Sequence, residues 1–230
     1  VGPNPGAGGG GPYWCGFFDR GPSRTYVNYN DSRLIEKYYS QMKEWFKYVD
    51  KYTVDGLLKR WPDTKYRDWY LGDWLAPMGV DAGNQASVDL VSNCFISECL
   101  GTMYNTALKL GKKEEAEEFA VRREELNKLI HQTFYRADEG IYSTGSQLDM
   151  CYPMLVGVVP DSLYNKVKDN MIAITEENHK GHIAVGLLGV PFLTVWSVQN
   201  KKVDFFFQLL KKPDYPGYLY MIDHGATATW

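Results

Sequence analysis

Apolar residues recur at helical spacing along most of this chain. Between residues 31 and 52 they repeat every three or four positions and so form one face of a helix. These apolar positions are Leu34, Tyr38, Met42, Trp45 and Val49. The polar Asp31 stands just before the repeat. We therefore predict a helix over residues 31–52 with Asp31 as its N-cap.

Two longer helices are predicted at residues 87–110 and 112–135. The first carries an apolar stripe with further apolar residues on both sides, which predicts burial on more than one face. The second has an acidic and basic outer face, typical of a solvated helix surface. Gly111 separates them and suits the left-handed conformation that closes a helix. Such a short connection predicts an antiparallel helical hairpin.

The remaining segments continue the helical pattern. Residues 14–29 show no clear period and are predicted to be irregular, and Ile141–Tyr142 is a short extended piece. Further helices are predicted at 146–158, 161–175, 185–198 and 203–210. No strands alternate with helices, and no sequence repeat has a fixed period. The pattern favours an all-α fold of helical hairpins arranged in a ring, with functional loops at one end.

The segment from residue 55 to residue 85 differs from the helices around it. Prolines and glycines interrupt it, and large aromatic rings alternate with carboxylates. The rings are Trp61, Tyr66, Trp69, Tyr70 and Trp74, and the acids are Asp63, Asp68 and Asp73. Rings stack on the C–H faces of sugars, and carboxylates accept hydrogen bonds from sugar hydroxyls, so this composition suits a carbohydrate site. The alternative is that the rings cap helix ends as ordinary core.

Composition and charge narrow the partners. With 25 basic and 28 acidic residues the net charge is −3, which gives no basic footprint for nucleic acid or a membrane surface. No apolar run approaches the roughly 20 residues that span a bilayer. The four cysteines and four histidines have no zinc-ligand spacing, so no metal or cofactor is predicted, although one disulfide bridge stays open. The chain begins VGPNPG with no signal peptide, which leaves the compartment undefined (periplasmic, secreted or cytoplasmic).

Four phrases together resemble a known family. They are GGGGPYWCG (8–16), YRDWYLGDWL (66–75), GHIAVGLLGVPFL (181–193) and YPGYLYMIDHGATATW (215–230). In order and spacing they resemble the catalytic domain of bacterial α-L-rhamnosidases, the family 78 glycoside hydrolases. The resemblance implies a six-hairpin (α/α)6 barrel, with residues 1–230 forming a single, partial catalytic domain.

The resemblance also indicates what this chain lacks. The family's general acid lies in a D-E-R-L-G-W-type motif, which is absent here. Its likeliest general base is a Glu after the closing G-A-T-T-x-W phrase, and this chain stops at Trp230. We therefore expect a fragment that is inactive alone, from a bacterial enzyme that hydrolyses terminal α-L-rhamnosides with inversion and without a cofactor.

Site residues follow from the resemblance. Asp73 is expected to bind rhamnose hydroxyls and Trp74 to stack on the sugar's apolar face, with Trp69, Tyr70 and Trp14 as weaker sugar-binding candidates. The alternatives are a capping or turn acid after Gly72 for Asp73, and a buried anchor for Trp14.

Two further candidates precede the closing phrase. Asp223 is a catalytic candidate, and its neighbour His224 could hold water or a sugar hydroxyl. His182 is expected to be structural and to bind a loop carbonyl.

Two other functions stay open. One is a different carbohydrate-active enzyme on an (α/α)6 barrel, although a phosphorylase needs a cationic pocket for phosphate and the candidate loops hold no cluster of Lys, Arg and His beyond Lys65 and Arg67. The other is a non-catalytic helical module that binds sugar. Flanking coding sequence that contains both missing carboxylates favours the rhamnosidase.

Overall fold

The computed structural model describes residues 11–61, 70–77 and 83–228. It is mostly helical, as predicted, and it divides into two compact units. The first unit comprises residues 1–71 and 89–133, and the second comprises residues 72–88 and 134–230. Helix α4 (Gln85–Lys109) starts in the second unit and continues in the first. That residues 1–230 form one partial domain stays a prediction.

The first unit holds three helices before α4. They are α1 (Pro12–Cys15), α2 (Phe17–Tyr29) and α3 (Arg33–Asp50). The prediction of irregular structure over residues 14–29 is therefore wrong. Gly16 divides α1 from α2, and a Cβ there would lie 2.4 Å from the ring of Phe95 on α4. Packing against a distant helix thus stabilises a segment whose own sequence shows no helical period.

Helix α3 is close to its prediction, but its buried face is rotated. The buried residues are Ile35, Tyr39, Met42, Phe46 and Val49. Only Met42 and Val49 belong to the predicted stripe, and Leu34 is 36% exposed. The Asp31 carboxylate accepts the backbone N–H of Arg33 at 3.0 Å, although Ser32 occupies the N-cap position. Neighbouring apolar residues compete for the core here, so spacing alone does not decide which of them is buried.

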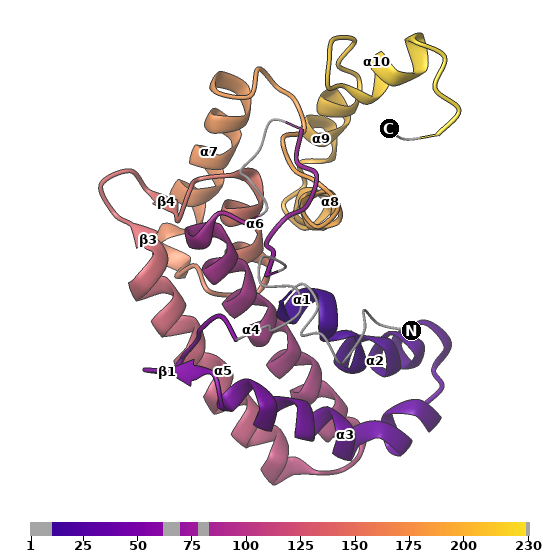
Figure 1. Cartoon of the computed structure of the whole chain (residues 1–230), viewed down its shortest axis with the longest axis vertical. Helices are drawn as coiled ribbons and strands as arrows, with labels where there is room; N and C mark the ends of the chain where they lie inside the picture. Colours follow the sequence, from indigo (N-terminus) through magenta and orange to yellow (C-terminus); the bar gives the residue numbers. More distant parts are fainter. Residues whose placement is uncertain (1–10, 62–69, 78–82, 229–230) are drawn as a thin grey trace. The chain divides into compact units, whose positions relative to one another are not determined.

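The predicted hairpin of α4 and α5 (Lys113–Phe134) is confirmed. Gly111 has a positive φ of 74°, and Ser97 Oγ donates to Asn127 Oδ1 across the pair at 2.6 Å. The two helices run side by side in Figure 1. A two-stranded ladder of β1 (Thr53–Val54) and β2 (Leu57–Leu58) completes the first unit, and Asn93 of α4 binds the Leu58 backbone.

The second unit begins with a short ladder and continues with five helices among its described residues. The strands are β3 (Tyr135–Arg136) and β4 (Ile141–Tyr142), which form an antiparallel pair. The helices are α6 (Gln147–Leu155), α7 (Asp161–Glu177), α8 (Gly189–Gln199), α9 (Val203–Leu210) and α10 (Tyr218–Asp223). Figure 1 shows the part of this unit after residue 134 in salmon to yellow.

Helix α6 is the centre of this core. It packs against both α7 and α8, and its residues 147–154 are all buried. Tyr152 stacks on Phe192 of α8 at 4.0 Å between ring centroids, and Trp196 is fully buried.

Within the described residues no helix is both long and apolar enough to cross a bilayer. Cys94, Cys99 and Cys151 are buried.

The helix predicted over 185–198 begins four residues later, at Gly189. The preceding residues are not helical because side chains from elsewhere in the unit bind their backbone N–H groups. These interactions bring distant loops together and build the candidate site.

Candidate functional site

Asp73 joins two distant loops of the second unit. Its carboxylate accepts the backbone N–H groups of Gly186 at 2.7 Å, Leu188 at 3.0 Å and Gly189 at 3.1 Å, as well as that of Trp74 at 2.9 Å. The N–H of Leu187 donates to the carbonyl oxygen of Trp74 at 2.8 Å. We call this set of contacts between residues 73–74 and 186–189 the Asp73 clasp.

Glycine makes this approach possible. A Cβ at Gly186 would lie 1.9 Å from the carbonyl oxygen of Trp74, and one at Gly189 would lie 2.7 Å from Asp73 Oδ2. Both distances are below any real contact, so neither position accepts a side chain without movement of the backbone. Gly186 and Gly189 of GHIAVGLLG therefore let the loop meet the carboxylate.

Gln147 supports the same loop from the other side. Its amide nitrogen donates to Thr175 Oγ1 and to the carbonyl oxygen of His182, both at 3.0 Å, and its Oε1 accepts the N–H of Ala184 at 2.9 Å. Gln147 is 1% exposed, so these bonds are made away from water. The sequence analysis did not single out Gln147, because no motif or spacing marks it.

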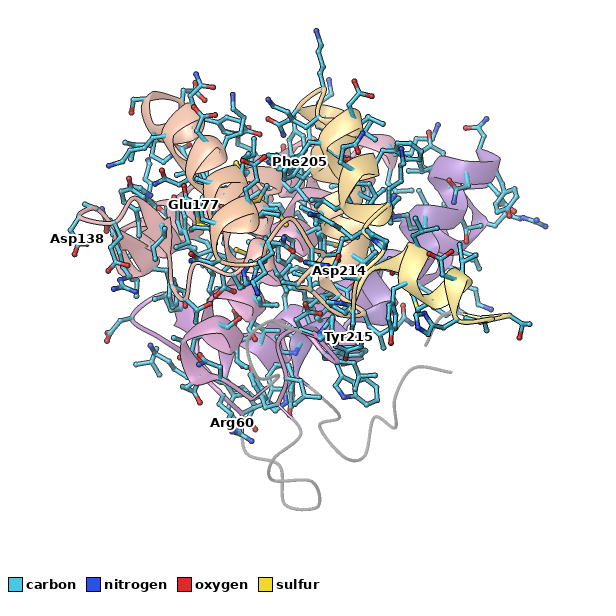
Figure 2. All side chains as sticks on the ribbon, turned by 90° about the horizontal axis from the view of Figure 1, so that it is seen from above. Arg60, Asp138, Glu177, Phe205, Asp214 and Tyr215 are labelled. Carbon is cyan, nitrogen blue, oxygen red and sulfur yellow. The ribbon has the colours of Figure 1, made fainter. Side chains whose placement is uncertain are left out.

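His182 has the structural role expected of it. Its Nδ1 lies 2.9 Å from the carbonyl oxygen of His179, which confirms the predicted loop carbonyl. Its Nε2 lies 3.1 Å from a carboxylate oxygen of Asp214. Asp214 is on the loop between α9 and α10 and is labelled in Figure 2. His182 is buried and Asp214 is exposed, so the pair ties an inner loop to an outer one.

A cavity of about 460 Å³ lies beside these loops. Aliphatic side chains from residues 183–191 form one wall, and Tyr215, Tyr218 and Tyr220 belong to a second wall from residues 215–221. Leu75 and Pro77 complete the lining. We call this cavity the tyrosine pocket. No charged side chain is among its lining residues in the described part of the chain, so it favours ring stacking and contact with apolar groups.

Two buried carboxyls in this unit have a raised pKa. Burial raises the pKa of Asp73, and its backbone N–H donors oppose this increase. Burial also raises the pKa of Asp149, against hydrogen bonds from Thr144 and Ser87. Both carboxyls are buried and accept hydrogen bonds from protein groups, and sugar binding by Asp73 stays a prediction.

The predicted sugar-binding residues fall in different places. Trp14 and Tyr70 belong to the first unit, and Trp69 lies outside the described residues. Tyr70 is 4% exposed and packs edge to face on Trp61 at 5.3 Å, as a core residue does. Trp14 is half-buried and packs against Tyr13. Sugar binding by these residues stays a prediction, and for Tyr70 the packing favours the alternative of ordinary core.

The other candidates lie in the second unit. Trp74 is half-buried and contributes its carbonyl oxygen to the clasp. Asp223 and His224 are exposed at the end of α10. The centroid of the His224 ring lies 4.0 Å from that of Tyr220, which lines the tyrosine pocket. His224 is therefore adjacent to a residue of the pocket lining.

Comparison with known proteins identifies the family. The model of the bacterial α-L-rhamnosidase six-hairpin glycosidase domain matches residues 1–230. The chain belongs to this family. It is 27% identical to an α-L-rhamnosidase of Alteromonas sp. (strain LOR) over 216 residues, covering 91% of the chain and 22% of that protein. An α-L-rhamnosidase of Streptomyces avermitilis is 26% identical over 209 residues, with 91% and 19% covered.

Solved rhamnosidase structures share the fold. That of Dictyoglumus thermophilum superposes with a TM-score of 0.84 at 20% identity, over 95% of this chain and 24% of that one. That of S. avermitilis complexed with L-rhamnose gives 0.79 at 22% identity, over 94% and 19%. The predicted six-hairpin fold is thereby confirmed, and this rhamnosidase-family chain spans about a fifth of the length of the curated relatives above.

Proposed function

We propose that a protein containing this chain hydrolyses terminal α-L-rhamnosides, and that the tyrosine pocket is part of its sugar site. One observation carries the proposal. Three phrases shared with the family, at residues 66–75, 181–193 and 215–230, each contribute residues to the lining of this one pocket. Segments more than 100 residues apart thus meet at a single hollow in one compact unit.

The chemistry of the pocket suits a deoxy sugar. Tyrosine rings stack on C–H faces, the aliphatic wall receives a methyl group, and phenolic hydroxyls and backbone groups bind the sugar hydroxyls. Crystallised relatives from S. avermitilis and Klebsiella oxytoca hold rhamnose, which supports the same ligand here. Two of the predicted binding residues contact residues that line the pocket. The carbonyl oxygen of Trp74 accepts the N–H of Leu187, and the His224 ring contacts that of Tyr220.

In this proposal the chain holds the sugar and does not itself break the bond. An inverting glycosidase needs an acid and a base with carboxyls roughly 6.5–9.5 Å apart. No carboxylate lines the pocket among the described residues, and Asp223 is the candidate that this chain offers nearby. We propose that the main acid and base come from polypeptide outside residues 1–230. The absence of a carboxylate from the described pocket lining also favours the second candidate function, a non-catalytic sugar-binding module.

Binding and turnover test this proposal separately. We expect the 230-residue chain to bind L-rhamnose by isothermal titration calorimetry, more tightly than D-glucose, and to release no p-nitrophenol from the α-L-rhamnoside. Leu187→Arg, at the exposed edge of the pocket, should abolish binding. Val198→Arg is the matched control, because Val198 is equally exposed in the same unit and does not line the pocket.

Each result has a distinct meaning. Binding that survives Leu187→Arg overturns the location of the site. Release of p-nitrophenol by the chain alone overturns the assignment of acid and base to other polypeptide. A longer protein that contains this chain and binds rhamnose without hydrolysing rhamnosides is a sugar-binding module.

A further inference from the structure

The aliphatic wall of the tyrosine pocket is held by residues outside its own loop. Four successive N–H groups, those of residues 186–189, all donate to residues 73 and 74. Three of them bind the Asp73 carboxylate, and the fourth binds the Trp74 carbonyl oxygen. The side chains of Val185, Leu187 and Val190, which line the pocket, are attached to this same stretch. The position of the wall therefore depends on the clasp.

The carboxylate has little capacity left for another partner. An ionised carboxylate offers about four lone-pair sites. Asp73 Oδ1 accepts from Trp74, Leu188 and Gly189, and Oδ2 accepts from Gly186. The residue is 7% exposed. By this count only Oδ2 has an acceptor site left, and the burial of Asp73 restricts the approach of a sugar hydroxyl to it.

We infer that Asp73 is a positioning residue of the sugar site: it fixes the aliphatic wall of the tyrosine pocket and controls sugar affinity without touching the sugar. This inference rests on the proposed function, because it assumes that the pocket holds a rhamnoside. It departs from the role expected from sequence, in which Asp73 binds rhamnose hydroxyls directly.

Two substitutions disturb the clasp in different ways. Asp73→Asn keeps the shape but replaces one oxygen with an NH2 group, which cannot accept an N–H, so at least one loop donor loses its partner. Gly186→Ala leaves the carboxylate intact, but its Cβ forces the loop away from Trp74. Both move the wall, and only the first changes the group that could contact sugar. Asp138→Asn is the control, at an exposed carboxylate in the turn between β3 and β4 labelled in Figure 2.

The test measures affinity for methyl α-L-rhamnoside and for analogues that each lack one ring hydroxyl. Because Asp73→Asn displaces the wall that contacts the sugar, we expect it to weaken binding at least about tenfold. A positioning role predicts the same factor for every analogue, a comparable loss for Gly186→Ala, and little further loss in the double variant. Direct contact predicts that the Asp73→Asn penalty disappears for one analogue and that Gly186→Ala has a separate, additive effect.

Amide hydrogen exchange supplies a readout without sugar. In the unaltered chain the N–H groups of Gly186, Leu188 and Gly189 should be protected, and Asp73→Asn should accelerate their exchange while α7 amides stay protected. Unchanged exchange at these three amides, or a penalty confined to one hydroxyl, overturns the inference. If the unaltered chain binds no rhamnoside, the proposed function fails, and the exchange data still decide whether Asp73 holds the wall. If Asp73→Asn does not fold, Gly186→Ala decides: unchanged affinity overturns the inference, and weakened affinity supports it.

Discussion

Replacing Gln147 with leucine should destabilise the second unit through the loop that lines its pocket. Leucine keeps most of the side-chain volume and removes all three hydrogen bonds. The carbonyl oxygen of His182 and the N–H of Ala184 then lose the partner that Gln147 provided. Thr175 Oγ1 keeps its own bond to the Met171 carbonyl oxygen at 2.8 Å, so the main damage falls on the loop.

The magnitude follows from two buried backbone groups. Each group left without a partner costs about 1–3 kcal/mol, which gives about 2–6 kcal/mol for the pair. Removing the buried amide and adding apolar surface offsets roughly 1–2 kcal/mol of this loss. We therefore expect the free energy of unfolding of the second unit to fall by about 1–4 kcal/mol, a large share of the roughly 5–15 kcal/mol typical of a domain.

Urea unfolding followed by near-ultraviolet circular dichroism measures this loss, with amide exchange of α6 and α8 locating it in the second unit. With a slope of about 2 kcal/mol per molar urea, the midpoint should fall by roughly 0.5–2 M. Gln208→Leu on α9 is the matched control, because that side chain is exposed. A loss below about 1 kcal/mol, no larger than that of the control, would refute the reasoning, since the loop would then satisfy its backbone without Gln147.

Three further predictions concern other buried polar contacts. Asn93→Leu removes two hydrogen bonds to the Leu58 backbone, at 2.8 and 3.1 Å, and should lower the stability of the first unit to urea by about 2–4 kcal/mol. Ser146→Ala removes the side-chain cap of α6, which accepts the Asp149 N–H at 3.1 Å, and should cost about 1 kcal/mol by thermal denaturation. Burial raises the pKa of Asp149, so its protonated form is favoured by folding; its stabilising contribution is complete below about pH 3.9 and is lost as the pH rises through the folded pKa. The stability of the unaltered chain should therefore decline relative to Asp149→Asn as the pH rises above about pH 4, in urea titrations at several pH values.

Exposed substitutions serve as controls for these three. Asn165→Leu and Ser162→Ala lie on α7, and each should change stability by less than about 0.5 kcal/mol. Equal losses for Asn93→Leu and Asn165→Leu would show that the Leu58 bonds contribute nothing. A pH-independent difference between Asp149→Asn and the unaltered chain would mean that the Asp149 carboxyl titrates alike in the folded and unfolded states.

Local sequence was sufficient for the long helices. The hairpin at residues 87–135 was predicted to within two residues at each end, because consecutive side chains alone define an apolar stripe and Gly111 defines its break. The strand at Ile141–Tyr142 and the helix at 203–210 also have their predicted bounds, because they too were predicted from neighbouring residues. The family phrases, too, could be read from the sequence, and they matched the family.

Contacts between distant residues decided what local patterns left undetermined. Residues 17–29 are helical, and the preceding Gly16 packs against the ring of Phe95. In α3, Ile35 is buried and Leu34 is exposed. The clasp joins Asp73 to N–H groups 113 to 116 positions later, and no spacing rule links them. A capping acid and a sugar-binding acid look the same in sequence, since the difference lies in which donors surround the carboxylate.

The sequence by itself therefore determined the long helices, the pairing of α4 with α5 and the family to which the chain belongs, because helical periodicity and short motifs are properties of neighbouring residues. Only the tertiary structure decided that Asp73 faces inward, that Gln147 holds the pocket loop and that three phrases line one cavity. Burial and hydrogen-bond partners belong to the folded chain, since they depend on which segments meet in space.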